Sequence, residues 1–387
     1  MTEKINIPPG YKNSPLGIIP EEWEVKRLGE ICTHFKSGTT ITAKEITEEG
    51  LYPVYGGNGL RGYSNTYTHN GEYILIGRQG ALCGNINLVC GKSYISEHAI
   101  AVQTDEDMRW LRYKLENWNL NRFSESSAQP GLSVEKLVRY KLTVPTLNEQ
   151  IGIATILQLW DTAIEKQSEL IEKLKLRKRA LMQQLLTGKK RLPGFSGEWK
   201  EVKLGDIVSF STQTIETAKI YKERYVGTEN MLSDCNGIIL YDKDIPYIQV
   251  REYKDGDILM SNIRPYLKKI WLSNCDGGCS TDIHVIRNKV NERVNTKFLY
   301  YVLMLDTFFE YAMSGAKGSK MPRGDANMLT KYPICYPPIT EQLAIINILT
   351  DADKEIELAK EKLASLQSQK QGLMQQLLTG KKRIMQL

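Results

Sequence analysis

Hydrophobic residues recur along two stretches of the chain with the alternating four-and-three spacing of a coiled coil. Between residues 153 and 185 this spacing selects ten positions, of which eight are apolar, and between residues 345 and 377 nine of ten are apolar. Neither stretch contains a proline, and Gly188 and Gly380 follow as helix stops. The pattern predicts two long helices that pair along an apolar seam.

One lysine interrupts each seam at the same place, Lys178 in the first and Lys370 in the second. A polar residue at a seam position can fix the register or orientation of a helix pair. A lysine can also bury its stem while its ammonium group reaches water. The sequence leaves both interpretations open.

Short apolar runs bounded by Gly, Asp and Asn lie outside the two helices. Residues 73–76, 258–260 and 284–286 are such runs, and their length and flanks predict strands. The expected fold class is α+β, with two mixed α/β domains separated by two long antiparallel coiled-coil helices. A two-fold relation between the copies predicts the antiparallel arrangement, because each helix follows its own domain.

The chain contains an internal repeat. The eleven residues LMQQLLTGKKR at 181–191 recur unchanged at 373–383, which is 192 residues later. The same offset relates the Glu-Gln dipeptides at 149–150 and 341–342, and both dipeptides follow a proline-containing approach. Such self-similarity indicates a duplicated unit and a pseudo-two-fold architecture.

The upstream halves of the two copies have diverged. Their openings at Trp23 and Trp199 match at an offset of 176, so the regions between differ in length by sixteen residues. Residues 71–78 resemble residues 256–264, each an acidic turn and an apolar strand followed by an arginine. We expect a repeated scaffold whose polar side chains differ. The predicted parts are a first domain at 1–147, a first spacer helix at 148–190, a second domain at 191–339 and a second spacer helix at 340–387.

Composition narrows the class of protein. With 387 residues the chain can bury two cores, and its net charge of +6 only weakly favours a polyanionic partner. Seven scattered cysteines suit a reducing compartment. No apolar run approaches the roughly 20 residues that span a bilayer, and the N-terminus lacks the order of a secretion signal. We expect a cytoplasmic protein with no membrane partner.

Motifs for catalysis are missing from the sequence. It has no G-x-x-x-x-G-K-[ST] loop for ATP and no Asn-Pro-Pro-Tyr or Asp-Pro-Pro-Tyr motif for a flipped adenine. The cysteine spacings at 83 and 90, and at 275 and 279, are not those of zinc sites, and the four histidines are scattered. We therefore expect no catalytic residues, no metal and no cofactor of the chain's own.

These features resemble the specificity subunit of type I restriction-modification systems over essentially the full chain. The specific elements are the tryptophan openings, the proline-then-Glu-Gln helix starts and the repeated LLTGKKR ends. The resemblance implies two target-recognition domains that read a bipartite site on double-stranded DNA. It also implies two methyltransferase subunits, to which two motor-nuclease subunits can add. S-adenosylmethionine, ATP and Mg²⁺ would then belong to those partners.

The geometry independently suggests a ruler. A helix from residue 153 to residue 185 rises about 48 Å at about 1.5 Å per residue, or roughly 14 base pairs of DNA at about 3.4 Å each. A coiled-coil adaptor that joins two protein clients is an alternative from another class. An enzyme in its own right is a third alternative, which the missing motifs disfavour.

Candidate DNA-reading residues in the first domain lie after strands. The glycine-rich loop at 56–63 offers Asn58, Arg61 and Tyr63, although a simple hairpin connection would have the same composition. Arg78 and Gln79 directly follow an apolar strand and are the better candidates. Arginine and amide side chains are the common bidentate partners of guanine and adenine.

Candidates in the second domain are mostly cationic. They are Arg264, Tyr266, Lys268 and Lys269, and then Lys317, Lys320 and Arg323. The stretch 317–323 resembles a loop that clamps a phosphate backbone, whereas its counterpart 127–133 lacks the cations. We expect the two domains to contribute unequally to salt-dependent affinity.

The repeated helix ends are candidates for docking the methyltransferase subunits. Their alternative role is a cap on the coiled coil, but an eleven-residue identity extends beyond what a cap needs, which favours docking. The candidate residues are Leu181, Gln184, Leu185, Lys189, Leu373, Gln376, Leu377 and Lys381.

Overall fold

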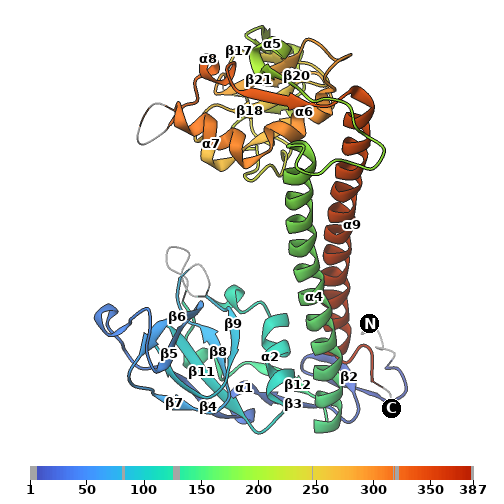
Figure 1. Ribbon diagram of the computed structural model, residues 1–387. Coiled ribbons are helices and arrows are strands. Elements are labelled where there is room, and N and C mark those ends of the chain that lie inside the picture. The colour runs from blue at the N-terminus through green and yellow to red at the C-terminus, as the bar shows by residue number, and fades with distance from the viewer. Residues whose placement is uncertain are drawn as a thin grey trace. The chain divides into compact units, whose positions relative to one another are not determined.

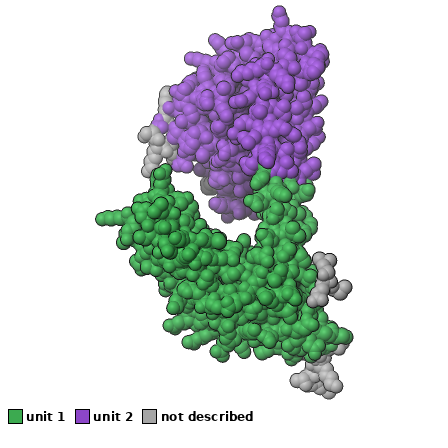
Figure 2. Space-filling view, turned by 60° about the horizontal axis from the view of Figure 1, so that its bottom comes forward, with its two compact units in different colours: residues 1–169, 361–387 green, residues 170–360 purple. Residues whose placement is uncertain are grey.

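The computed structural model describes residues 7–80, 83–124, 131–245, 247–316, 318 and 322–384. The chain divides into two compact units, one of residues 1–169 and 361–387 and the other of residues 170–360 (Figure 2). Each unit contains one globular domain, the first part of the long helix that follows that domain, and the last part of the other long helix (Figure 1).

The domain of the first unit is built on two four-stranded sheets. The first has the order β4 (Cys32–Ser37), β11 (Ala99–Thr104), β8 (Tyr73–Gly77), β9 (Ile86–Val89). The second has the order β6 (Gly59–Ser64), β5 (Tyr52–Gly56), β10 (Lys92–Ile95), β7 (His69–Asn70). Two pairs complete the strands, β12 (Lys141–Val144) with β3 (Glu24–Arg27) and β1 (Tyr11–Ser14) with β2 (Gly17–Pro20). The helices are α1 (Leu28–Ile31), α2 (Met108–Asn117) and α3 (Val134–Leu137), with 3-10 turns η1 (Ala43–Glu45) and η2 (Leu120–Phe123).

The domain of the second unit has the same plan. Its first sheet has the order β14 (Val208–Ser211), β21 (Ile283–Asn288), β18 (Ile258–Ser261), β19 (Ile270–Leu272). Its second has the order β15 (Thr214–Glu216), β17 (Gln249–Tyr253), β20 (Gly277–Cys279), β16 (Tyr225–Val226), and β13 (Lys200–Lys203) pairs with β22 (Pro333–Tyr336). The helices are α5 (Leu204–Ile207), α6 (Thr296–Leu303), α7 (Asp306–Ser314) and α8 (Ala326–Leu329), with 3-10 turns η3 (Thr217–Lys219), η4 (Lys222–Arg224) and η5 (Pro265–Leu267).

The first sheets correspond strand for strand. Ile74 of β8 pairs with Val102 of β11, and Ile258 of β18 pairs with Ile286 of β21, so both strands recur at an offset of 184. The strands predicted at 73–76, 258–260 and 284–286 are confirmed as parts of β8, β18 and β21. The matching strands β8 and β18 are almost fully buried in their two sheets, which explains their continuous apolar runs.

The second sheets differ at their edges. Each contains one parallel pair, which is central in the first unit, β5 with β10, and lies at an edge of the sheet in the second, β16 with β20. In the first unit β6 adds to β5, whereas in the second unit the fourth strand, β15, adds to β17 on the other side. Among the described residues the β5–β6 hairpin therefore has no counterpart in the second unit. The edges of this sheet are where the duplicated domains differ in topology.

The two predicted helices are confirmed as α4 (Leu147–Leu186) and α9 (Ile339–Leu377). All twenty seam positions are buried or half-buried, and Gly188 and Gly380 follow with φ of 69° and 75°. In the first unit Asp161 contacts Lys370 and Glu149 contacts Arg383, so the helices run antiparallel. Within the described segments no helix is long and apolar enough to cross a membrane.

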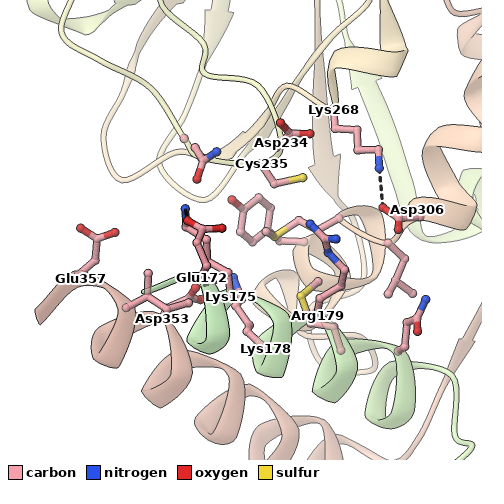
Figure 3. Close-up of a pocket in the computed structure, with 18 of the residues that line it drawn as sticks. Glu172, Lys175, Lys178, Arg179, Asp234, Cys235, Lys268, Asp306, Asp353 and Glu357 are labelled. Atoms are coloured by element: carbon pink, nitrogen blue, oxygen red, sulfur yellow. Dashed lines mark hydrogen bonds and ion pairs between the residues drawn. The ribbon is translucent and has the colours of Figure 1, made fainter. Parts of the chain in front are cut away.

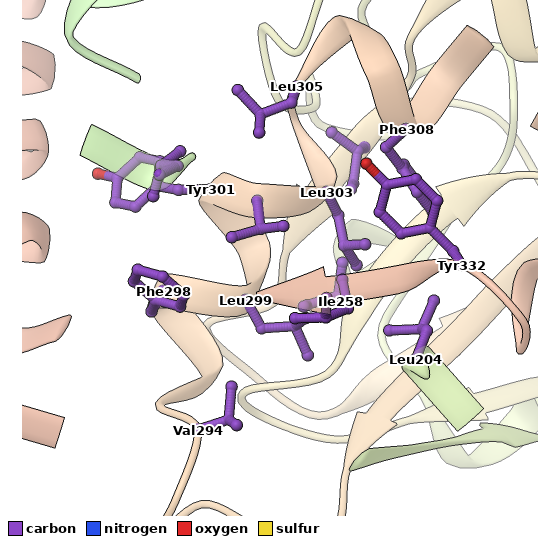
Figure 4. Close-up of a cluster of buried hydrophobic side chains, with 14 of the residues drawn as sticks. Leu204, Ile258, Val294, Phe298, Leu299, Tyr301, Leu303, Leu305, Phe308 and Tyr332 are labelled. Carbon is purple, nitrogen blue, oxygen red and sulfur yellow. The ribbon is translucent and has the colours of Figure 1, made fainter. Parts of the chain in front are cut away.

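Each domain core includes the ends of the long helices. In the second unit Phe298 and Leu299 of α6 pack with Ile258 (Figure 4), and the same cluster contains Leu185 of α4 and Leu349 of α9. The first unit repeats this arrangement with the start of α4 and the end of α9. Each fully buried aliphatic or phenyl side chain contributes about 1.5 to 3 kcal/mol. The helices are therefore parts of the domain cores as well as a coiled coil.

Candidate nucleic-acid interface

A buried glutamine fastens each long helix to its domain. Gln150 accepts a hydrogen bond from the backbone N–H of Asp107, the N-cap of α2, at 3.0 Å, and donates to the carbonyl of Pro145 at 3.0 Å. Gln342 makes the matching two bonds in the second unit, at 2.9 and 2.8 Å. Both glutamines are fully buried. The repeated proline-then-Glu-Gln motif is thus the joint between each domain and the long helix that follows it.

The neighbouring glutamates bind the arginines that end the repeat. Arg383 donates from Nε to Glu149 at 2.7 Å, and Arg191 donates from Nε to Glu341 at 2.7 Å. Trp23 also donates to Glu149, at 2.8 Å. Hydrogen bonds from the arginines to these acids raise the pKa of both arginines. In each unit this contact ties the end of one helix to the start of the other.

Just after β8 in the first domain and β18 in the second, the backbone makes the same pair of hydrogen bonds to two other segments. The N–H of Arg78 donates to the carbonyl of His98 at 2.9 Å, and the carbonyl of Arg78 accepts from Leu132 at 2.9 Å. Asn262 makes the two matching bonds at 2.8 and 2.9 Å. The sequence alone matched Arg78 with Arg264. The backbone bonds instead show that Arg78 corresponds to Asn262.

We call these sites the first corner (residues 78–79, 98 and 131–132) and the second corner (residues 262–263, 282 and 323–324). Their backbone bonds agree, but their side chains do not. Arg78, Gln79 and His98 of the first corner are replaced by Asn262, Ile263 and Asp282 in the second. The duplication has kept the framework and changed the donors and acceptors that it carries.

The turn of the β5–β6 hairpin packs against the first corner. A β-carbon on Gly57 would lie 2.7 Å from the carbonyl oxygen of His98 and 3.1 Å from Cα of Gly77. Only glycine permits so close a backbone approach. The hairpin and the corner, which are distant in sequence, therefore form one surface.

Most of the first-domain candidates gather on this surface. Asn58 is exposed in the turn and Arg61 is exposed on β6, while Tyr63 is half-buried further along that strand. Exposed Gln79 lies 3.3 Å from Nδ1 of His98. The glycine-rich segment at 56–63 forms the hairpin connection that the sequence left open as an alternative, with Gly57 and Asn58 as its turn, because β6 pairs with β5 from Gly59 onward. His98, half-buried beside Gln79, is a further polar residue of this surface.

Three candidates of the second domain lie at the second corner. Arg264 and Tyr266 are exposed around η5, and the N–H of Arg264 donates to the carbonyl of Pro322 at 2.8 Å. Arg323 is exposed and pairs with Asp282 at 3.2 Å. The structure thus brings together residues that are about sixty positions apart in sequence. Lys317 and Lys320 lie outside the described residues.

The structure gives the other two lysines partners within the domain, and their predicted contact with DNA stays a prediction. Lys268 forms an ion pair with Asp306 at 2.7 Å, and Lys269 donates to the carbonyl of Thr228 at 2.6 Å. Arg264 and Lys268 both adopt left-handed φ values, 51° and 49°, so the chain reverses around η5 and returns Lys268 to the domain. Burial lowers the pKa of Lys269. Both half-buried lysines thus have a contact that holds the loop in place.

Lys268 also borders a cavity of about 520 Å³ in the second unit, between the long helices and the loop around Cys235 (Figure 3). Four of its five cations form ion pairs with acids of the lining, so the cavity has little unpaired charge. Burial raises the pKa of the Cys235 thiol to about 12, which disfavours a nucleophilic role. Across the described ranges no group of three or more His, Cys, Asp or Glu could hold a metal ion.

The repeated helix ends serve the cores more than we expected. Leu185 and Leu377 are 3% exposed and belong to the two domain cores, and Leu181 and Leu373 are half-buried against them. Leu185 and Leu377 are therefore covered by the cores, whereas Leu181 and Leu373 remain partly exposed. The predicted docking role of the helix ends stays a prediction.

Another part of the repeated helix ends is exposed and does not pack in a domain core. We call it the helix-end patch, and its two copies are Gln183, Gln184, Lys189, Lys190 and Gln375, Gln376, Lys381, Lys382. In the part of the chain that the structure describes, these side chains form no hydrogen bond or ion pair. They are exposed, identical in both copies and unnecessary for the core.

The family described as "Type I restriction modification DNA specificity domain" matches the chain twice, over residues 20–176 and 196–368. The chain belongs to this family. The EcoprrI specificity subunit of Escherichia coli is 44% identical over 160 residues, which cover 39% of this chain and only 40% of that protein. The MjaVIII specificity subunit of Methanocaldococcus jannaschii is 25% identical over 410 residues, which cover 95% of each.

Solved structures agree with this specificity-subunit fold. The S subunit of a type I restriction-modification system from M. genitalium has a TM-score of 0.58 and 16% identity, over 98% of this chain and 99% of that one. At that identity the likeness shows the fold alone. The two family matches coincide with the two copies of the internal repeat.

Proposed function

We propose that the chain is a non-catalytic recognition subunit that directs adenine methylation to a bipartite DNA target and, with motor-nuclease subunits, DNA cleavage. The observation that carries the proposal is the pair of corners, which share one backbone framework and differ in their side chains. A duplicated reader of two different half-sites needs this combination, because phosphate contacts position a protein while base contacts specify the sequence.

The chemistry of the corners supports base reading. At the first corner a guanidinium and an amide, Arg78 and Gln79, match the edges of guanine and adenine. At the second corner Arg264 and Arg323 supply guanidinium groups, and Tyr266 supplies an aromatic ring with a hydroxyl. Because the two sets differ, we expect two half-sites of different sequence.

The helix-end patch supports docking of two copies of one partner. Two identical exposed surfaces within a pseudo-two-fold chain fit two identical partners. We propose that these partners are the methyltransferase subunits, which would bind S-adenosylmethionine. In the same scheme the motor-nuclease subunits would bind ATP and Mg²⁺, and the complex would work in the cytoplasm.

The test is a selection from random double-stranded DNA with the full-length chain and any partner that co-purifies with it. We expect enrichment of two short half-sites at one fixed gap. The variant Gln79→Ala should relax the preference at one half-site and leave the other unchanged. Recovery of sequences without any shared preference would contradict the proposal and would favour a coiled-coil adaptor.

A further inference from the structure

The ring of His98 lies between a carboxylate and an amide at the first corner. Its Nε2 is 3.5 Å from Oε1 of Glu97, and its Nδ1 is 3.3 Å from Oε1 of Gln79. The other carboxylate oxygen of Glu97 accepts a hydrogen bond from the backbone N–H of Ile41 at 3.3 Å, which holds the acid in place. The His98 side chain is 44% exposed, so the ring can exchange protons with solvent.

Both contacts of the ring need a donor on its side. A carboxylate and an amide oxygen can only accept hydrogen bonds, and a neutral histidine carries a proton on just one of its two nitrogens. The doubly protonated ring donates to Glu97 and to Gln79 at once. The arrangement in the structure therefore matches a protonated His98 whose Nδ1–H holds the amide oxygen of Gln79.

Loss of one proton changes which atom of Gln79 the ring can hold. The carboxylate of Glu97 cannot donate, so it keeps the remaining proton of His98 on Nε2, and Nδ1 becomes an acceptor. An acceptor repels the amide oxygen of Gln79 and attracts its NH₂ group. A half turn about the last side-chain bond exchanges these two groups and leaves the shape of the side chain almost unchanged.

The amide group that points away from His98 is the one left for a base edge. With a protonated ring this group is the NH₂ of Gln79, a donor, which matches the acceptors of guanine and thymine in the major groove. With a neutral ring it is the oxygen, an acceptor, which matches the amino groups of adenine and cytosine. The protonation state of His98 thus selects between two pairs of bases.

Other ionisable groups around the ring come from neighbouring segments of the first domain. The carbonyl of Arg78 accepts from the thiol of Cys83 at 3.4 Å, and burial raises the pKa of that thiol. Arg61 belongs to the hairpin, where a β-carbon on Gly56 would lie 2.6 Å from its Cδ. The segment 39–41 contributes only uncharged side chains. Arginine and glutamate side chains keep their charge between about pH 5 and 8, whereas histidine does not.

We propose that His98 is a specificity-determining residue that orients the amide of Gln79 and so makes the preference at one half-site depend on pH. The inference rests on the proposed function, in which Gln79 reads a base. His98 acts as a positioning residue, because its ring turns the amide and need not touch the DNA. In the second corner Ile263 and Asp282 occupy the two places, so we expect no such dependence at the other half-site.

The experiment selects from random double-stranded DNA with the full-length chain and any co-purifying partner. It is done at about pH 5.5 and about pH 8, on either side of the ordinary histidine pKa of about 6.5. At one position of one half-site the wild type should favour guanine or thymine at the lower pH and adenine or cytosine at the higher pH. We expect the ratio of these bases to change about fivefold, the effect of one hydrogen bond.

Two variants separate the protonation of the ring from its bulk. In His98→Gln an uncharged amide can pair with Gln79 in either orientation, so the preference should no longer change with pH. In Glu97→Gln the new amide can donate to Nε2 as well as accept from it, which frees the neutral ring to donate from Nδ1. The change of preference with pH should therefore become smaller.

The matched control is His69→Gln, at a half-buried histidine of β7 in the same domain. It should keep the wild-type change with pH. The other half-site is a control within the same chain. His284 follows two residues after Asp282 of the second corner, and burial lowers its pKa to about 4, so it stays neutral at both pH values.

A wild-type preference that is the same at both pH values overturns the proposal, and so does a change that persists undiminished in folded His98→Gln. If that variant does not fold, His98→Asn replaces it and is judged by the same ratio. A change of equal size at both half-sites would also overturn the proposal. A wild-type chain that selects no half-sites at either pH would instead contradict the proposed function.

Discussion

Helices α2 and α6 occupy matching places in the two domains, and Lys114 of α2 is the one buried position at which they differ in charge. Its Nζ donates to Oγ1 of Thr143 at 2.8 Å and to the carbonyl of Leu378 at 2.5 Å. Burial lowers the pKa of Lys114 to about 7. In the second unit Val302 occupies the matching place, since it follows Tyr301 as Lys114 follows Tyr113.

This burial predicts a pH dependence of stability in the first unit. An unfolded lysine has a pKa of about 10.4, so between pH 7 and that value the unfolded state binds more protons than the folded state. Stability should therefore rise with pH across this window. Urea unfolding of the wild type and Lys114→Met between these limits should show the wild type gaining on the variant as the pH rises. If the free energies of unfolding of the wild type and the variant changed equally with pH, the Lys114 amine would not be desolvated.

Gly57 tests whether the hairpin and the first corner read DNA as one surface. A β-carbon there would meet backbone atoms of Gly77 and His98, so Gly57→Ala should displace the hairpin turn. Affinity for one half-site should fall, while the other half-site should keep its affinity, as measured on DNA with each half-site altered in turn. Gly372→Ala, in α9 and outside both corners, is the control, since its β-carbon would meet nothing within 4 Å. An equal loss at both half-sites would contradict this assignment.

At the scale of elements, substitutions of the glutamine at the joint between a domain and its long helix should strongly destabilise the folded chain. Gln150→Ala would leave the N–H of Asp107 and the carbonyl of Pro145 without partners in a buried site, which costs about 1 to 3 kcal/mol for each group. Urea unfolding should show this loss for Gln150→Ala, and equally for Gln342→Ala. Gln184→Ala, on an exposed turn of the same helix, should change the free energy of unfolding little. Equal stability of all three variants would argue against the joint.

The elements that the sequence predicted well are those with a long period or an exact repeat. Both long helices, their glycine ends and three core strands followed from spacing and apolar runs. The second sheets could not be predicted as a whole: the β5–β6 hairpin is local and was left open as an alternative, but β15 pairs with β17 over more than thirty residues, and such pairing leaves no local signal. The seam lysines Lys178 and Lys370 were visible in the sequence. Their ion-pair partners, Asp353 and Asp161, were missed, although these acids recur at the same offset of 192.

Candidate site residues were harder to place, for a physical reason. Lys268 and Arg264 are close in sequence and alike in charge, yet two left-handed residues turn one inward and leave the other exposed. Leu185 looked like a docking residue because it belongs to an exact repeat, but a core can preserve a sequence as strictly as an interface can. Burial separates these cases, and burial depends on tertiary contacts that sequence pattern does not contain.

At the scale of the whole molecule, the pseudo-two-fold repeat predicts two equivalent partner sites that can be removed one at a time. Lys189→Glu with Lys190→Glu reverses the charge of the first helix-end patch, whose lysines are exposed and take no part in either core.

Native mass spectrometry of the co-purified complex should then count one methyltransferase subunit instead of two. The same changes at Lys381 and Lys382 should give the same count, and all four changes together should leave the chain without that partner. Lys44→Glu, an exposed lysine of the first domain, is the control that should retain both subunits. Because the patches are identical, unequal losses from the two ends would mean that the partners bind elsewhere.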